Sequence, residues 1–154
     1  MKNLFFILFS AYVLSGCIEG GTHGYIKRFR YQTSKYKLEK VVQKIIIENP
    51  AISQDSVKDY YNDDTNYVTI KISHSELCNI YIFHYYGGKE YWNSSPTSAI
   101  SISYAYDKNG NGGSIGNGGV KWYEFKKRRR LIEPFEKDFI NKIDSLLGLK
   151  HTEE

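Results

Sequence analysis

Residues 98–106 constrain the fold of this chain more than any other segment. The sequence there is SAISISYAY, in which Ile100, Ile102, Tyr104 and Tyr106 alternate with alanine and serine. A period of two residues places the large side chains on one face of a β-strand and the small ones on the other. We therefore expect something to cover the small residues closely, for example a helix.

Two segments that precede this strand have a similar character. Residues 67–73 (YVTIKIS) and 79–86 (NIYIFHYY) are rich in β-branched and aromatic residues, as strands are. Residues 24–32 (GYIKRFRYQ) form a candidate edge strand with aromatic side chains on one side.

Residues 34–48 predict an amphipathic helix. From Leu38 onward, apolar residues recur at i, i+3, i+4, i+7 and i+8, and lysines occupy the other face. Pro50 disfavours helical geometry at Asn49, so the helix should end there.

A second helix lies near the end of the chain and has two possible starts. Its apolar stripe is Phe135, Phe139, Ile143 and Leu146, and Gly148 is suited to terminate it. The proline at position 134 either opens this helix in its first turn or kinks a longer helix that begins near residue 123.

These elements predict an α+β domain over residues 25–150. Short connections favour an antiparallel arrangement, and two amphipathic helices can bury their stripes together. We expect an antiparallel β-meander of three to five strands with two helices packed on one face. The other face of the sheet would be left to solvent or to a partner.

The first residues form a secretory signal. Lys2 precedes an apolar run over residues 4–14, which is too short for a comfortable membrane span. The run ends in LSGC (14–17), which resembles the lipobox of bacterial lipoproteins. The resemblance implies that residues 1–16 are a signal peptide and that Cys17 carries acyl chains. An ordinary secretory signal with a chance cysteine is the alternative.

A lipid on Cys17 would hold the folded part at a membrane. Two or more acyl chains suffice for stable anchoring, since each buried methylene contributes about 0.8 kcal/mol. Residues 17–24 are rich in glycine and would form a flexible tether. Ile18 carries no acidic inner-membrane retention signal, so we expect the outer membrane of a Gram-negative bacterium.

Composition and motifs exclude several functions. A net charge of +4 is too weak to indicate a nucleic-acid partner. With Cys17 lipidated, Cys78 has no cysteine partner, so stability must come from packing. The phosphate loop, G-x-S-x-G and H-E-x-x-H are all missing, so the sequence indicates no enzyme class, cofactor or metal.

DKNGNGGSIGNGG (107–119) begins like a calcium loop. Asp107, Asn109 and Asn111 occupy the first three ligand positions, but position 12 is Gly118, where an EF-hand requires a carboxylate. The EF-hand interpretation therefore fails. Glycines and Asn-Gly pairs favour a turn-rich connection, and a partner-binding loop is the alternative.

KKRRR (126–130) is the densest charge run. It is either a solvated helix start or a contact for anionic lipid headgroups, acidic glycans or an acidic protein. Aromatic residues that precede it could stack on a sugar or a protein. The candidate partner-binding residues are Asp107, Asn109, Asn111, Trp122, Tyr123, Lys126, Lys127, Arg128, Arg129 and Arg130.

The chain as a whole resembles the small uncharacterised lipoproteins of Gram-negative envelopes. We expect a non-catalytic, membrane-anchored binding module for a protein or glycan, of which an immunity-type inhibitor of a periplasmic toxin is one class. The alternative is a hydrolase of envelope polymers. It would need a pocket that joins His74 or His84 to a carboxylate such as Glu76 or Asp107, and separation of these side chains on different faces would argue against it.

Overall fold

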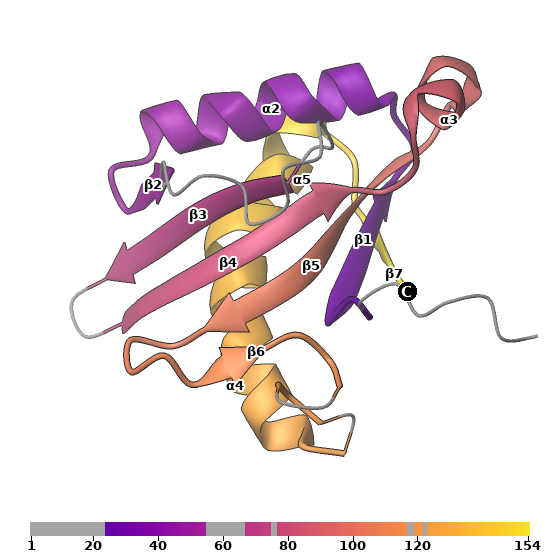
Figure 1. Ribbon diagram of the computed structural model, residues 1–154. Helices are drawn as coiled ribbons and strands as arrows, with labels where there is room; N and C mark the ends of the chain where they lie inside the picture. The colour runs from indigo at the N-terminus through magenta and orange to yellow at the C-terminus, as the bar shows by residue number, and fades with distance from the viewer. Residues whose placement is uncertain (1–23, 55–66, 75–76, 117–118, 122) are drawn as a thin grey trace, which may run out of the picture.

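A computed structural model describes residues 24–54, 67–74, 77–116, 119–121 and 123–154 (Figure 1). The expected signal peptide (1–16) and most of the expected tether (17–24) lie outside the described residues. The structure is an antiparallel sheet with helices on one face, which confirms the α+β prediction.

The sheet has seven strands within the described part of the chain, in the order β2-β3-β4-β5-β1-β7, with β6 beside β5. They are β1 (Lys27–Tyr31), β2 (Ile52–Gln54), β3 (Tyr67–His74), β4 (Leu77–Tyr85), β5 (Ser98–Tyr106), β6 (Gly112–Gly113) and β7 (Thr152–Glu153). The expected meander is β3, β4 and β5. The strands that the sequence pattern did not predict are two or three residues long, too short to show a period.

The strand β1 was expected at the edge of the sheet, and this is wrong. It pairs with β5 on one side and with the short β7 on the other. The sheet therefore includes residues 152–153, which lie beyond the domain end expected at residue 150.

The helical segments are α2 (Lys35–Glu48), α3 (Lys89–Ser94), α4 (Phe125–Phe135), the π-helical turn η1 (Glu136–Ile140) and α5 (Asn141–Leu147). The prediction for α2 is confirmed. Its N-cap is Ser34, whose hydroxyl accepts a hydrogen bond from the Lys37 N–H at 3.4 Å, and it ends before Asn49. For the last helix, the longer alternative is correct, because Pro134 lies inside α4.

Pro134 explains an irregularity in the last helix. It has no N–H to donate to the carbonyl four residues earlier, and its ring crowds that carbonyl. The chain continues through η1, a wider turn in which each residue advances less around the axis. Phe139 and Ile143 nevertheless stay buried, as the sequence pattern predicts. Leu147 is buried, whereas Leu146, which was expected on the stripe, is 47% exposed.

The core lies between the sheet and one layer of helices. Figure 1 shows α4, η1 and α5 behind the sheet, with α2 crossing from β1 towards β2. Rings from the two layers meet there: Tyr81 lies 4.9 Å from Phe135, and Phe83 lies 5.4 Å from Phe139, between centroids. The buried Tyr81 hydroxyl donates to the Leu131 carbonyl at 2.8 Å, so its polar atom is satisfied.

A β-bulge changes the two faces of β5. The register with β4 shifts between Ile82 and Phe83, so the alternation of β5 reverses around Ser103. Ile102 and Tyr104 were expected to share one face, but Ile102 faces the core and Tyr104 pairs with Ile82 on the helix-free face. A bulge has no reliable signal in the sequence pattern.

The expected helix over the small residues of β5 is wrong. Side chains from neighbouring strands cover the serines instead. The Arg28 Nε donates to Ser101 Oγ at 2.9 Å, and His84 Nδ1 lies 2.8 Å from Ser103 Oγ. Arg28 also lies over the rings of Tyr25 and Tyr86, 4.1 and 4.0 Å from their centroids.

Candidate functional site

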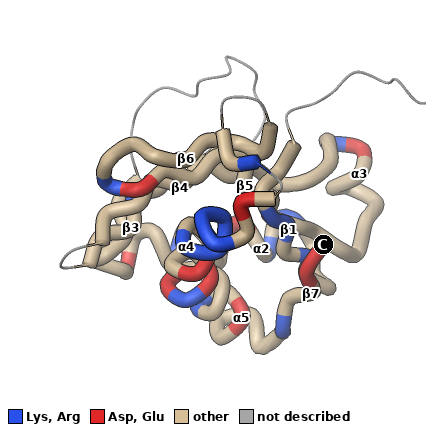
Figure 2. The backbone as a smooth tube through the Cα atoms, turned by 90° about the horizontal axis from the view of Figure 1, so that it is seen from below, with Lys and Arg blue, Asp and Glu red and all other residues tan. Residues whose placement is uncertain are grey.

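A groove of about 560 Å³ lies beside the first turns of α4. Charged residues from both ends of the chain meet there, although β1 and β7 are far apart in sequence. It is lined by Lys27, Phe125, Arg128, Arg129, Ile132, Glu133, Glu136, Glu153 and Glu154. Figure 2 views the molecule from this end, with the basic positions of α4 near the centre and the acidic positions of β7 to one side.

One wall of the groove is a fixed ion network. The Lys27 ammonium contacts the Glu136 carboxylate and lies 2.9 Å from Glu153 Oε1. Burial alone would lower the pKa of Lys27, but the hydrogen bonds to these two carboxylates outweigh it and raise that pKa. The hydrogen bond from Lys27 lowers the pKa of Glu153 in turn. This wall therefore holds one ammonium between two carboxylates.

The C-terminal residue is fixed in the same way. The carboxylate of Glu154 lies 2.7 Å from Arg30 Nε and 3.3 Å from Arg28 Nη1. The hydrogen bond from Arg30 lowers the pKa of the Glu154 carboxyl, and the bond from Arg28 adds to this. Glu153 and Glu154 are thus both anchored to β1, and the edge of the groove has a defined shape.

The opposite wall carries a basic side chain without such a partner. Arg129 Nε bonds to Glu133 Oε1 at 2.7 Å, one helical turn away. Arg128 is half-buried, and within the described residues its guanidinium has no ion pair or side-chain hydrogen bond. A guanidinium offers five donors in a planar fork, which suits a carboxylate or phosphate. Arg128 is therefore the group in this groove best placed to bind an anion.

The start of α4 departs from the usual chemistry of a helix N-terminus. Lys126 to Arg130 are all basic, and the first turn contains no acid. Cations at this end oppose the helix dipole, at a cost of about 0.3–1 kcal/mol each. Glu124, the N-cap, provides no side-chain cap, because its carboxylate accepts the Lys121 N–H at 2.8 Å. Such conflicts between local rules and structure are typical of functional sites.

The loop after β5 begins with a compact turn. Asp107 Oδ1 accepts the N–H groups of Asn109 and Asn111 at 2.9 and 2.8 Å, and Oδ2 accepts the Asn111 side-chain amide at 3.1 Å. The Asn111 side-chain bond is the main cause of a lowered pKa at Asp107, and nearby Lys127 adds a small effect. Gly112 closes the turn with φ of 151°, where a Cβ would lie 1.9 Å from the Ala105 carbonyl oxygen.

We expect millimolar calcium to leave the melting temperature unchanged. The Asp107 carboxylate already accepts three hydrogen bonds within its own turn, so few oxygens remain to coordinate a cation. An ion that binds only the native state would stabilise it by about 2.7 kcal/mol at about a hundredfold excess over its dissociation constant. Differential scanning calorimetry with and without calcium checks this. A rise in melting temperature that Asp107→Ala abolishes would show a calcium site.

The other candidate residues are divided among three places. Arg128 and Arg129 line the groove, and Lys127 lies near the Asp107 turn. Lys126 and Arg130 are exposed on α4, outside the groove lining. Tyr123 is also exposed, with the Lys121 ammonium 5.6 Å from its ring centroid. Trp122 lies outside the described residues.

Sequence reasoning missed much of the groove. Phe125, which is 65% exposed, and the acids Glu136 and Glu153 were not among the candidates. Glu153 belongs to a two-residue strand, which no periodic pattern could reveal. The available signal for Phe125 was its position in the sequence, as an apolar residue directly before the basic run KKRRR (126–130).

The residues of the hydrolase alternative are not brought together. His74 lies on the helix side of the sheet, 3.1 Å from Asp138 Oδ2 of η1. His84 lies on the opposite face beside Ser103, where burial and the Arg28 charge lower its pKa. The Asp107 carboxylate is bonded within its own turn, and Glu76 lies outside the described residues. Among the described residues, no group of three or more His, Cys, Asp or Glu side chains could hold a metal ion.

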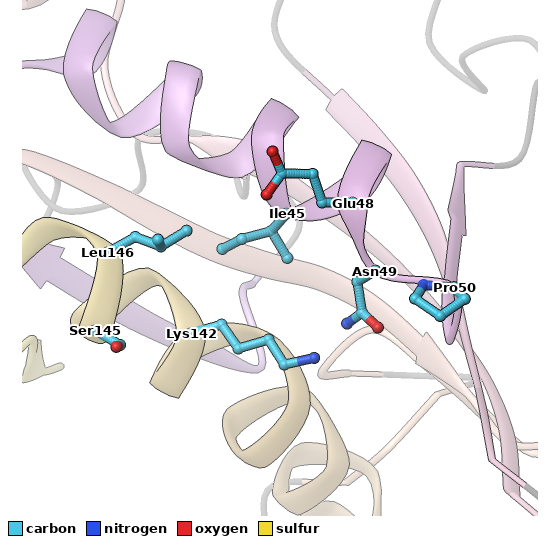
Figure 3. Close-up of a pocket in the computed structure, with 7 residues that line it drawn as sticks. All are labelled: Ile45, Glu48, Asn49, Pro50, Lys142, Ser145 and Leu146. Carbon is cyan, nitrogen blue, oxygen red and sulfur yellow. The ribbon is translucent and has the colours of Figure 1, made fainter.

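A second, smaller cavity of about 320 Å³ lies between α2 and α5 (Figure 3). Ile45 and Leu146 face it from the two helices. Asn49 closes one end, where its side-chain oxygen accepts the Ala51 N–H at 3.2 Å. Only Glu48 and Lys142 bring charge to it, so it offers fewer convergent polar groups than the groove beside α4.

Comparisons with protein-family models, characterised proteins and solved structures find no match. The described helices include none with the length and apolar character needed to cross a bilayer. The geometry of the groove and the motifs of the sequence are therefore the basis for a functional proposal.

Proposed function

We propose that this protein is a membrane-anchored envelope lipoprotein that binds a protein partner and catalyses no reaction. Lipid on Cys17 supplies the anchor, and the groove beside α4 supplies the binding site. The observation that carries the binding site is the half-buried Arg128, which lacks an ionic partner among the described residues and lies beside the exposed Phe125. Neutralising a periplasmic toxin, as immunity-type inhibitors do, is one role of this kind.

The chemistry of the groove favours a protein segment as its ligand. Arginine and aromatic residues are enriched at protein interfaces, and both supply the largest contributions to binding. A partner carboxylate can form a two-point contact with Arg128, while an adjacent apolar side chain packs on Phe125. The ion network of Lys27, Glu136 and Glu153 stays fixed and selects against segments with the wrong charge pattern.

Photo-crosslinking in the bacterium that makes the protein tests this site. A photoreactive phenylalanine analogue replaces Phe125 in the full chain, and Tyr36 in the control. The two positions are matched in exposure, at 65% and 64%, but Tyr36 lies on α2, away from the groove. We expect a discrete adduct with one envelope protein from position 125 and none from position 36.

A charge reversal at the groove makes the test specific. Arg128→Glu in the position-125 protein should reduce the adduct about tenfold or more, because removal of one buried charged contact costs about 2–5 kcal/mol. The same reversal at Lys37, an exposed residue of α2, should leave it intact. Equal adducts from both positions, or an adduct that survives Arg128→Glu unchanged, would exclude the groove as the binding site.

A further inference from the structure

The chain enters the folded domain beside the start of α4. Gly24, the first described residue, forms an antiparallel bridge with Ile115. Ile115 also forms a parallel bridge with Val120, and α4 begins only five residues later, at Phe125. In Figure 1, the start of β1, the strand β6 and the start of α4 lie at the same end of the molecule.

This entry point limits how far α4 can lie from a lipid on Cys17. Six residues lie between Cys17 and Gly24, so seven residue steps join them. Even a fully extended chain spans at most about 3.5 Å per residue, or about 25 Å in total. A lipidated Cys17 would therefore keep this end of the domain close to the headgroups, whatever the conformation of the tether.

The same end carries uncompensated positive charge. Lys126 and Arg130 are exposed, and among the described residues neither has an ion pair. The nearby acids are already engaged: Glu124 with the Lys121 N–H, Glu133 with Arg129, and Asp107 within its own turn. Figure 2, which looks onto this end, shows the basic start of α4 directed towards the viewer.

We propose that the basic face of α4, formed by the exposed Lys126 and Arg130 and the half-buried Lys127, docks on a surface of anionic lipid headgroups. This rests on the proposed lipid anchor and deepens it, because it fixes which end of the domain faces the membrane. Each basic residue near an anionic surface favours the docked orientation about fivefold. Arg128 and Arg129 line the groove at the side of the same helix and are not part of this face.

Lysine acetylation on vesicles tests the docking. The full lipoprotein is reconstituted into vesicles of phosphatidylcholine, alone or mixed with phosphatidylglycerol, and labelled with a water-soluble acetylating reagent. Mass spectrometry then gives the rate at each lysine. We expect Lys126 and Lys127 to react about tenfold more slowly on the anionic vesicles, and high salt to remove the protection. Lys37 and Lys44 on α2 should react equally on both.

Two matched variants identify the residues responsible. Lys126→Glu with Arg130→Glu should abolish the protection of Lys127, whereas Lys37→Glu with Lys44→Glu, an equal charge change on exposed α2 positions, should preserve it. The intact mass reports acylation of Cys17 in the same samples. If the protein is acylated but Lys126 and Lys127 are acetylated at equal rates on both vesicle types, the docking is wrong and the anchor stands. Protein without acyl chains would overturn the anchor, and the docking with it.

Discussion

Cys17→Ser is expected to abolish acylation of this protein and to remove it from the membrane fraction. In the lipobox interpretation of LSGC (14–17), the sulfur of Cys17 is the atom to which the first acyl chains are attached. Serine has a similar size but no thiol, so the lipid has no site of attachment. Metabolic labelling with an alkyne analogue of palmitate, followed by fractionation after a salt wash, measures both effects. We expect complete loss of label, an effect larger than any change in the groove can produce.

The second cysteine supplies the control. Cys78 lies on β4, is partly buried and forms no disulfide with another described residue. Cys78→Ser should therefore retain the label and the membrane location of the unmodified protein. If Cys17→Ser kept its label, or stayed in washed membranes at the unmodified level, the lipobox interpretation would be wrong.

Phe139→Ala is expected to lower the free energy of unfolding by about 3–5 kcal/mol. The Phe139 side chain is fully buried in η1, and its ring lies 5.4 Å from that of Phe83 and 5.0 Å from that of Phe135, between centroids. The substitution removes this apolar surface and leaves a cavity between the sheet and the helix, because a close-packed core relaxes only in part. Urea denaturation followed by circular dichroism measures the loss.

Leu146→Ala is the matched control for Phe139→Ala, because it lies on the next helical segment but is 47% exposed. It should cost less than about 1 kcal/mol, since an exposed side chain leaves no sealed cavity. Sequence pattern alone places both residues on one apolar stripe and predicts similar losses. Equal losses would therefore show that Leu146 contributes to the core as much as Phe139 does.

Regular elements of this fold follow from the sequence, while its irregularities do not. The helix over residues 34–48 and the strand over 98–106 have clear periods, and the structure has both. Three local features were not predicted from the sequence: the bulge at Ser103, the π-helical turn after Pro134, and the pairing of β7 with β1. Each is one to five residues long, and each depends on contacts with distant parts of the chain that a local period does not encode.

The candidate site was predictable only in its basic half. A run such as KKRRR marks positive charge without indicating which side chains have partners. In the helix, the side chains of this run point in different directions. Arg129 pairs with Glu133, Arg128 lines the groove and Lys126 faces solvent. The acidic wall comes from η1 and the C-terminal residues, and its place beside α4 depends on the tertiary fold.

The position of β1 between β5 and β7 has a mechanical consequence for a protein held by its N-terminal end. With the proposed anchor on Cys17, a force would reach the described domain at Gly24, which bridges to Ile115, and would then pass into β1. Because β1 is hydrogen-bonded on both sides, a pull along its axis loads these bonds together in shear, and Lys27 adds ionic links to Glu136 and Glu153. A strand bonded on one side only could instead be peeled away bond by bond. If the proposed anchor and partner are correct, the domain would be attached through a strand suited to withstand traction between them.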